Sequence, residues 1–486
     1  MVMKNGHIIF LAASVLMLAL GSCTKETVEE GLAGEELVAV GGERVITLSF
    51  GESTRATLDG LTPHFSAGDR IMVYNSGARE ICTVVLDDDG TPTISTSLSG
   101  TLNAVYPVEA AVLSGSSITG ITVPAVQSGK FSDALIATAN NIGSSNTATF
   151  ESQTAILRFY VDKNIGVQSV SVTSSATDIA TGSRSITVSA SSGSTLDAVS
   201  DDPKRRLCYV SALTGVNANT LTFSGLTSTQ GLVTKPCTVN AALDAGKVYN
   251  AFIPYYIDMG DGGKWGYCNI GAFLPEEPGL YFAWADTVGY SSGHSFSVSN
   301  APYYQLTDDY NKYNGTEPKI SILEPKDDAA TVNWGPGWRM PSGDIYYGCT
   351  EFEDLQQKSY MGFYSGSWSS VDPTGLYVFL PEDATGKTVG TFGSVDGLDL
   401  TKAKLFFPLT GNKYNAVHTD QNSGCYWSRV LYDYSLHNYA WCIKFNESSC
   451  SHNMHSARNY GLCIRPVYDD TIHPVDSNPM IDGGTY

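Results

Sequence analysis

Short runs in which apolar and polar residues alternate recur throughout residues 45–255. Gly, Asp, Asn and Ser separate the runs, and a period of two between such breaks predicts antiparallel β-strands. The clearest runs are Val45–Phe50, Arg70–Tyr74, Ala155–Val161, Ser169–Val172 and Lys247–Phe252. The segment is too long for one small sandwich, so we expect a mostly β chain that begins with two β-sandwiches, at 45–130 and 131–255.

Composition excludes two broad classes of protein. Of the 486 residues, 42% are hydrophobic and 16% are charged, which is enough apolar material for a packed core and rules out a disordered polyelectrolyte. The 29 Lys and Arg against 49 Asp and Glu give a net charge of −20. Nucleic acid does not attract an acidic chain, so no nucleic-acid partner is expected.

The first residues have the pattern of an export signal. Lys4 precedes an apolar stretch, Ile8–Leu20, which is too short to cross a bilayer comfortably and ends in Leu20-Gly21-Ser22-Cys23. Small residues before a cysteine form the lipobox of a bacterial lipoprotein signal. We expect a signal peptide at 1–22, a lipid on Cys23 that anchors the chain to the outer membrane, and a flexible tether at 23–44. The alternative is an ordinary secretory signal with a cysteine nearby.

Two motifs, Gly51–Thr57 and Phe65–Tyr74, follow an isolated early strand in a chain that begins with a lipobox. In this combination residues 45–255 resemble the fimbrillin family, the subunits of type V pili. The resemblance implies transthyretin-like β-sandwiches and a fixed order of strand, polar loop ending in Arg, protease cut and mature domain. In this chain the strand is Val45–Phe50 and the matching cut follows Arg55, with Arg44 as the alternative.

The physical consequence of such a cut can be stated from the residues. Ile46, Leu48 and Phe50 alternate, so they face one side of a strand and fill one sandwich. Removing the strand would leave an apolar slot and two unpaired strand edges. A strand from another pilus subunit could refill the slot by β-augmentation. The alternative is that Val45–Phe50 is simply the first strand of a monomeric surface lipoprotein.

The chain changes character near residue 256, since all seven tryptophans lie at or beyond Trp265. Three blocks carry the new pattern. The first is Trp265–Ala272 with Pro275–Glu277 and Tyr281–Trp284, the second is Asp327–Ala330 with Trp334–Ser342, and the third is Cys425–Ser428 with Ala440–Phe445 and Arg458–Val467. In order and spacing they resemble the FISUMP-type domains, which share the broad fold of C-type lectins and of the formylglycine-generating enzyme. The resemblance implies an α+β, C-type-lectin-like domain at 256–468.

Missing motifs limit what this resemblance implies about activity. The calcium-dependent sugar motifs of C-type lectins are absent, and so is the paired redox cysteine context of the enzyme. We therefore expect no enzymatic activity, no catalytic residue and no cofactor. Cys450, His452 and His455 could converge on a metal ion, but a solvent-facing turn is the simpler interpretation and no metal is expected.

Aromatic residues in the C-terminal loops are the candidate ligand-binding residues. Loops carry function disproportionately, and Tyr and Trp offer flat faces suited to sugar rings or to protein partners. The candidates are Trp368, Tyr414, Tyr432, Tyr434 and His437. Ordinary loop packing is the alternative for each of them.

Other residues of this region are expected to have structural roles. Trp334, Trp338 and Trp427 are expected in the core, and Arg465 is expected to hold buried acceptors. Pro341-Ser342 predicts the start of a helix. The six cysteines of the region predict at least one disulfide in an exported chain.

The C-terminal tail, 469–486, contains two prolines and no sustained alternation, so it is a poor donor strand. A chain that accepts a strand but donates none fits the tip of a pilus. We therefore expect a tip adhesin at the cell surface that binds a host or microbial glycan or protein. The alternatives are a non-polymerising surface lipoprotein that captures glycan and, less favoured, an enzyme of the formylglycine-generating type.

Overall fold

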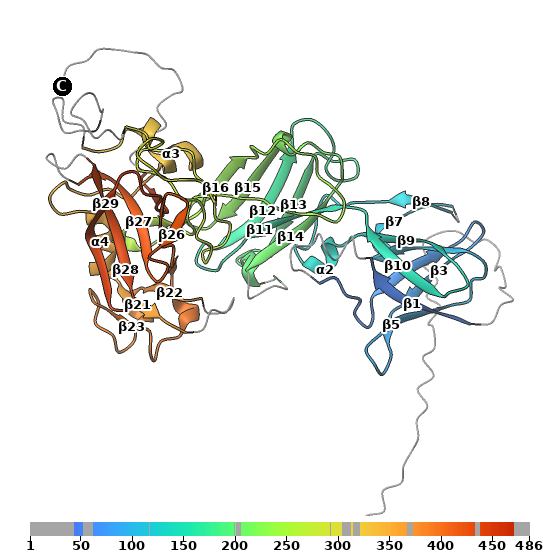
Figure 1. Cartoon of the computed structure of the whole chain (residues 1–486). Coiled ribbons are helices and arrows are strands. Elements are labelled where there is room, and N and C mark those ends of the chain that lie inside the picture. Colours follow the sequence, from blue (N-terminus) through green and yellow to red (C-terminus); the bar gives the residue numbers. More distant parts are fainter. Residues whose placement is uncertain are drawn as a thin grey trace, which may run out of the picture. The chain divides into compact units, whose positions relative to one another are not determined.

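The computed structural model describes residues 43–51, 62–115, 117–198, 200, 206–291, 293–303, 313, 321–366, 373–432 and 438–470. The protein is mostly β, as expected from the alternating runs. It divides into two compact units (Figure 1): the first holds the described residues up to Thr122 together with Ile136–Gln153, and the second holds Val123–Leu135 and the described residues from Thr154. Five predicted site residues lie outside the described residues: Cys23, Arg55, Trp368, Tyr434 and His437.

The first unit is built on eight strands in the order β3-β2-β6-β9-β10-β1-β5-β4. Their bounds are β1 Arg44–Phe50, β2 Arg70–Tyr74, β3 Arg79–Thr83, β4 Val85–Leu86, β5 Pro92–Thr96, β6 Leu102–Tyr106, β9 Ala137–Ile142 and β10 Thr147–Ser152. A separate hairpin joins β7 (Ala111–Ser114) to β8 (Ser117–Ile121). The runs predicted at Val45–Phe50 and Arg70–Tyr74 are therefore strands.

The first unit extends past residue 130, where we had expected it to end. The ladder explains why, because β9 pairs with β6 and β10 pairs with β1. The short helix α2 (Phe131–Ala134) that interrupts this run belongs to the second unit. The chain thus contributes Val123–Leu135 to the second unit before Ile136–Gln153 completes the first.

The second unit begins with two sheets. One has the order β14-β11-β17 and the other β13-β12-β15-β16. The strands are β11 Ala155–Tyr160, β12 Val167–Ser174, β13 Ser185–Ser189, β14 Leu207–Ala212, β15 Leu221–Thr227, β16 Gly231–Pro236 and β17 Val248–Asn250. The ring of Phe159 on β11 lies 6.1 Å from that of Phe223 on β15, which places the two sheets face to face as a sandwich.

Every residue of β11 is buried, although a strand of an antiparallel sandwich normally has one solvent-exposed face. Residues that follow position 256 cover the second face. Tyr160 stacks on Tyr267 with ring centroids 4.7 Å apart, and the guanidinium of Arg158 lies over the ring of Phe273. The predicted boundary at 256 is therefore a packed junction inside the second unit.

In the C-terminal module (residues 256–468), the described residues form four sheets and two α-helices. The sheets have the orders β18-β19-β30-β20, β23-β21-β22-β24, β27-β28-β29 and β25-β26. The helices are α3 (Ala329–Trp334) and α4 (Thr350–Lys358). The strands are β18 Tyr256–Asp258, β19 Lys264–Gly266, β20 Trp338–Arg339, β21 Tyr360–Tyr364, β22 Gly375–Phe379, β23 Phe392–Ser394, β24 Leu405–Pro408, β25 Asn412–Tyr414, β26 Val417–Thr419, β27 Gly424–Leu431, β28 Tyr439–Asn446, β29 Ser449–Ala457 and β30 Val467–Tyr468. Because β30 pairs with β19, the two ends of the module meet.

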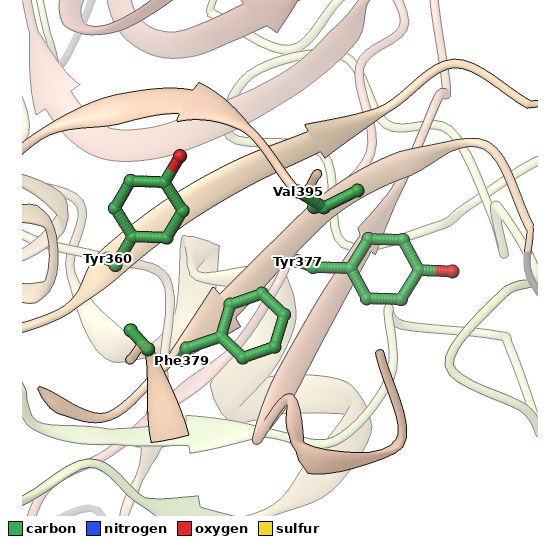
Figure 2. Packing of buried hydrophobic residues seen from close by; sticks show 5 residues of the cluster. Tyr360, Tyr377, Phe379 and Val395 are labelled. Carbon is green, nitrogen blue, oxygen red and sulfur yellow. The ribbon is translucent and has the colours of Figure 1, made fainter. Parts of the chain in front are cut away.

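One of its apolar clusters lies on the sheet that contains β21 and β22. Tyr360, Tyr377, Phe379 and Val395 pack together there (Figure 2). The tryptophans expected in the core are buried, since Trp334, Trp338 and Trp427 are at most 5% exposed. Aromatic packing therefore supplies much of the core in this module, as the concentration of tryptophan after residue 264 indicated.

Two structural predictions for the module are wrong. Helix α4 starts at Thr350 rather than at Pro341-Ser342, because the backbone N–H of Ser342 donates to the carboxylate of Glu351 (2.7 Å) and the chain first makes a tight turn. The expected disulfide is absent: all six cysteines of the module are free thiols, and all but Cys450 are buried. Burial raises the pKa of the thiols of Cys268 and Cys425 to about 12.

Candidate functional site

Strand β1 lies inside its sheet and is paired along both sides. It runs parallel to β10, with Thr47 opposite Thr147, and antiparallel to β5, with Ile46 opposite Ile94. An inner strand gives up hydrogen bonds to two neighbours when it leaves. Removal of β1 would therefore expose one edge of β10 and one edge of β5, as predicted from the sequence.

The inward face of β1 carries three apolar side chains. Ile46, Leu48 and Phe50 are at most 4% exposed, whereas Val45 on the other face is 53% exposed. The ring of Phe50 stacks on that of Phe65, with centroids 4.3 Å apart. Burial of each side chain contributes about 1.5–3 kcal/mol, so this strand fills a slot that is costly to leave empty.

Arg44, the alternative cleavage residue, holds the start of β1 in place. Its guanidinium donates to the Oδ1 of Asn146 (2.5 Å), to the carbonyl of Gly100 (2.9 Å) and to the carbonyl of Gly143. A cut after Arg44 would leave the apolar residues of β1 attached to the domain. Only a cut between Gly51 and Thr62, the interval that contains Arg55, separates β1 from the rest of the unit.

Aromatic rings line one face of the sheet formed by β27, β28 and β29. Trp441 pairs with His455, and Tyr439 lies two residues before Trp441, so the three side chains share a face. The ring of His455 lies 4.1 Å from that of Tyr432 and 5.3 Å from that of Tyr439. Tyr432 also packs 4.6 Å from Trp441, which is nearly buried beneath it.

Two more tyrosines continue this row of rings. Tyr460 lies in the turn after β29, and its ring is 4.8 Å from that of Tyr414 on β25. The backbone N–H of Tyr460 donates to the carbonyl of Ala457 (2.9 Å), and Ala457 is the residue that pairs with Tyr439. Tyr460 therefore follows Tyr439 along this edge of the sheet and continues it toward Tyr414. We call Tyr414, Tyr460, Tyr439, His455 and Tyr432 the aromatic strip.

The strip has two strongly exposed aromatic neighbours. The indole Nε1 of Trp441 donates to the carbonyl of Ile345 (3.1 Å), which fixes the loop before α4 beside the strip. The next two residues, Tyr346 and Tyr347, are 71% and 69% exposed. This loop therefore presents further aromatic surface next to the Trp441 end of the strip.

The structure brings two of the predicted binding residues, Tyr414 and Tyr432, into the same strip. Sequence analysis did not select Tyr439 or Tyr460, and it weighed His455 only as a metal ligand. The β28–β29 register that aligns these rings joins segments whose pairing cannot be read from alternation alone. The sequence feature that could have identified these residues is the high frequency of Tyr and His after residue 413.

The loop considered for metal binding is strand β29, and its side chains diverge. The thiol of Cys450 contacts the sulfur of Met361 (3.9 Å), and the Nε2 of His452 lies 3.5 Å from a carboxylate oxygen of Glu353. His455 belongs to the aromatic strip. Within the residues described, no three His, Cys, Asp or Glu side chains are grouped to hold a metal.

A small cavity lies between the second sandwich and the C-terminal module. Its volume is about 50 Å³, and Asp162, Arg206 and Lys404 are among the residues that line it. Arg206 pairs with Asp162, and Lys404 pairs with Asp383 at 3.3 Å. About 10–15 Å³ of such space holds one water molecule, so the cavity suits a few solvent molecules better than a ligand.

No protein-family model and no curated protein matches the chain. Solved structures match part of it, including two from Bacteroides species. A candidate cell adhesion protein from Bacteroides uniformis is 15% identical, with a TM-score of 0.27 over 43% of this chain and 91% of its own. A second, from Bacteroides ovatus, is 14% identical, with a TM-score of 0.23 over 43% of this chain and 89% of its own. At these TM-scores the two likenesses carry no argument about fold or function.

The described residues include no helix that is long and apolar enough to span a membrane. The longest α-helix among them, α4, has nine residues.

Proposed function

We propose that the chain is a cell-surface adhesive subunit whose first strand is removed by proteolysis and replaced by a strand from another subunit. The observation that carries this proposal is the place of β1, which is paired on both sides and buries Ile46, Leu48 and Phe50. A strand so placed can be exchanged only if its covalent link to Thr62 is cut. The predicted cut after Arg55 lies in that link.

The slot sets what an incoming strand must supply. It must run parallel to β10 and antiparallel to β5, and it must present three apolar side chains at alternate positions. A strand from a neighbouring pilus subunit could meet these requirements. Lipid attached at Cys23 would hold the uncleaved chain at the outer membrane until β1 is lost.

The C-terminal end of the described chain supports a terminal place in a filament. Strand β30 is an inner strand between β19 and β20, and Asp469, which follows it, pairs with Arg339 at 3.3 Å. This end is therefore part of the module and is not available as a donor. Residues 471–486 contain Pro474 and Pro479 and are poorly suited to pairing in a sheet.

Two variants test the cleavage step in cells. Arg55→Ala is expected to be exported and folded but missing from sheared surface filaments, because β1 stays linked to its domain. Arg44→Lys is the matched control, since it removes the other arginine and keeps a cationic donor near Asn146. Immunoblots of the filament and membrane fractions give the readout. Filament incorporation of Arg55→Ala would refute the cleavage step, and the protein would then be better described as a monomeric surface lipoprotein.

A further inference from the structure

The aromatic strip combines exposed ring area with neutral hydrogen-bonding groups. Tyr414 is 42% exposed, His455 is exposed, and Tyr432, Tyr439 and Tyr460 are partly exposed. The four tyrosines each carry a hydroxyl at the end of an apolar ring. Such side chains give large contact area at low cost in conformational entropy, and their hydroxyls can bond a polar ligand.

The charged side chains near the strip interact with other side chains of the module. Lys444 pairs with Asp420 at 2.9 Å, and His452 faces Glu353. The ammonium of Lys413 lies 4.0 Å from the centre of the Tyr281 ring. The strip itself contains no carboxylate, although the chain has a net charge of −20. These features favour a neutral ligand over a strongly charged one.

We propose that the aromatic strip is a binding site for a neutral glycan chain, with Tyr460, Tyr439 and His455 as its central contacts. This inference rests on the adhesive role proposed above and specifies its ligand. The CH-rich faces of sugar rings pack on aromatic faces, while sugar hydroxyls bond to tyrosine hydroxyls and to the imidazole. Because five rings follow one another, the site fits several consecutive sugar units rather than one.

A protein partner fits the strip less well. A stable protein interface buries about 1,600 Å² in total over a broad, well-packed patch. The strip is a single row of rings, each with a hydroxyl or a ring nitrogen, and Trp441 is nearly buried beneath it. A narrow row of amphipathic rings suits a linear polyhydroxylated ligand.

The test uses the purified full chain on an array of neutral oligosaccharides, with sialylated and sulfated oligosaccharides and deglycosylated matrix proteins printed beside them. We expect binding to neutral oligosaccharides of several units. Tyr460→Ala and Tyr439→Ala should each weaken it about tenfold, a typical loss when a central aromatic anchor is removed. Tyr460→Phe keeps the ring and should lose less. Tyr74→Ala, on β2 of the first unit, is the matched control and should leave binding unchanged.

Three results would overturn the inference: no neutral oligosaccharide retained, binding only to acidic glycans or deglycosylated protein, or binding that survives both alanine substitutions. Circular dichroism of each variant shows that it is folded, and Tyr460→Phe separates loss of ring contact from loss of fold. The proposed strand exchange is read from filament fractions, independently of the array. Filament incorporation without glycan binding defeats this inference alone, and glycan binding without loss of β1 defeats the exchange alone.

Discussion

Arg465 shows how a single residue organises the C-terminal module. It is fully buried, and its guanidinium donates to the Oδ1 of Asn269 (2.8 Å) and to the carbonyls of Gly266, Tyr267 and Phe406. Burial lowers the pKa of this guanidinium. A side chain with five donors in a fixed fork can satisfy several backbone acceptors at once, which is why its role could be predicted from the sequence.

The thiols of Cys268 and Cys425 should be inert in the native protein. With pKa values raised by burial to about 12, each is ionised on the order of one part in ten thousand at pH 8. We expect iodoacetamide to modify neither residue in native protein and to modify both in urea without a reductant. Mass spectrometry of the peptides gives the readout. Resistance in urea would reveal a disulfide and contradict the free thiols of the structure.

At the level of elements, β1 is the inner strand that joins β10 to β5 in the sheet of the first unit. Phe50→Ala in the uncleaved protein should lower the free energy of unfolding of this unit by about 3–5 kcal/mol, because the stacked ring on Phe65 is lost and a cavity remains. Urea denaturation measures the change.

Val45→Ala is the control for Phe50→Ala on the same strand. Its side chain is 53% exposed, so its effect should stay within about 0.5 kcal/mol. Equal effects of the two substitutions would contradict the one-sided burial of β1.

Elements with a clear local period could be predicted from the sequence, and elements fixed by distant partners could not. Alternation located β1 and the face that it buries. It could not show that β9 and β10 return to the first unit, because that depends on pairing with β6 and β1. Helix α4 was placed too early because Ser342 looks like a cap, whereas its backbone N–H is bound by Glu351 within a turn. Tyr414 and Tyr432 could be proposed individually from the sequence. The strip that joins them could not, because it depends on the pairing of β28 with β29.

At the scale of the whole molecule, the shift in tryptophan content marks a change of module without marking a flexible joint. Phe252 lies 5.2 Å from Trp334, and the amide of Asn164 donates to the carbonyl of Ala403 (3.1 Å). Together with the stack of Tyr160 on Tyr267, these contacts join the second sandwich to the C-terminal module. Composition shows that two segments differ, but it does not show whether they pack against each other.

Calorimetry of the uncleaved chain should therefore show two unfolding transitions rather than three. Tyr160→Ala removes the stack on Tyr267 and should shift one transition, which reports on the second sandwich and the C-terminal module together. Phe50→Ala should shift the other transition alone. Separate melting of the second sandwich and the C-terminal module would contradict the packed junction.

In the proposed function, β1 is removed before the protein acts in a filament. N-terminal sequencing of the protein recovered from sheared surface filaments, compared with the outer-membrane fraction, tests it most directly. We expect a start at Ala56 in filaments and a lipidated Cys23 in the membrane. A Cys23 start in both fractions would show that β1 is retained and would contradict strand exchange.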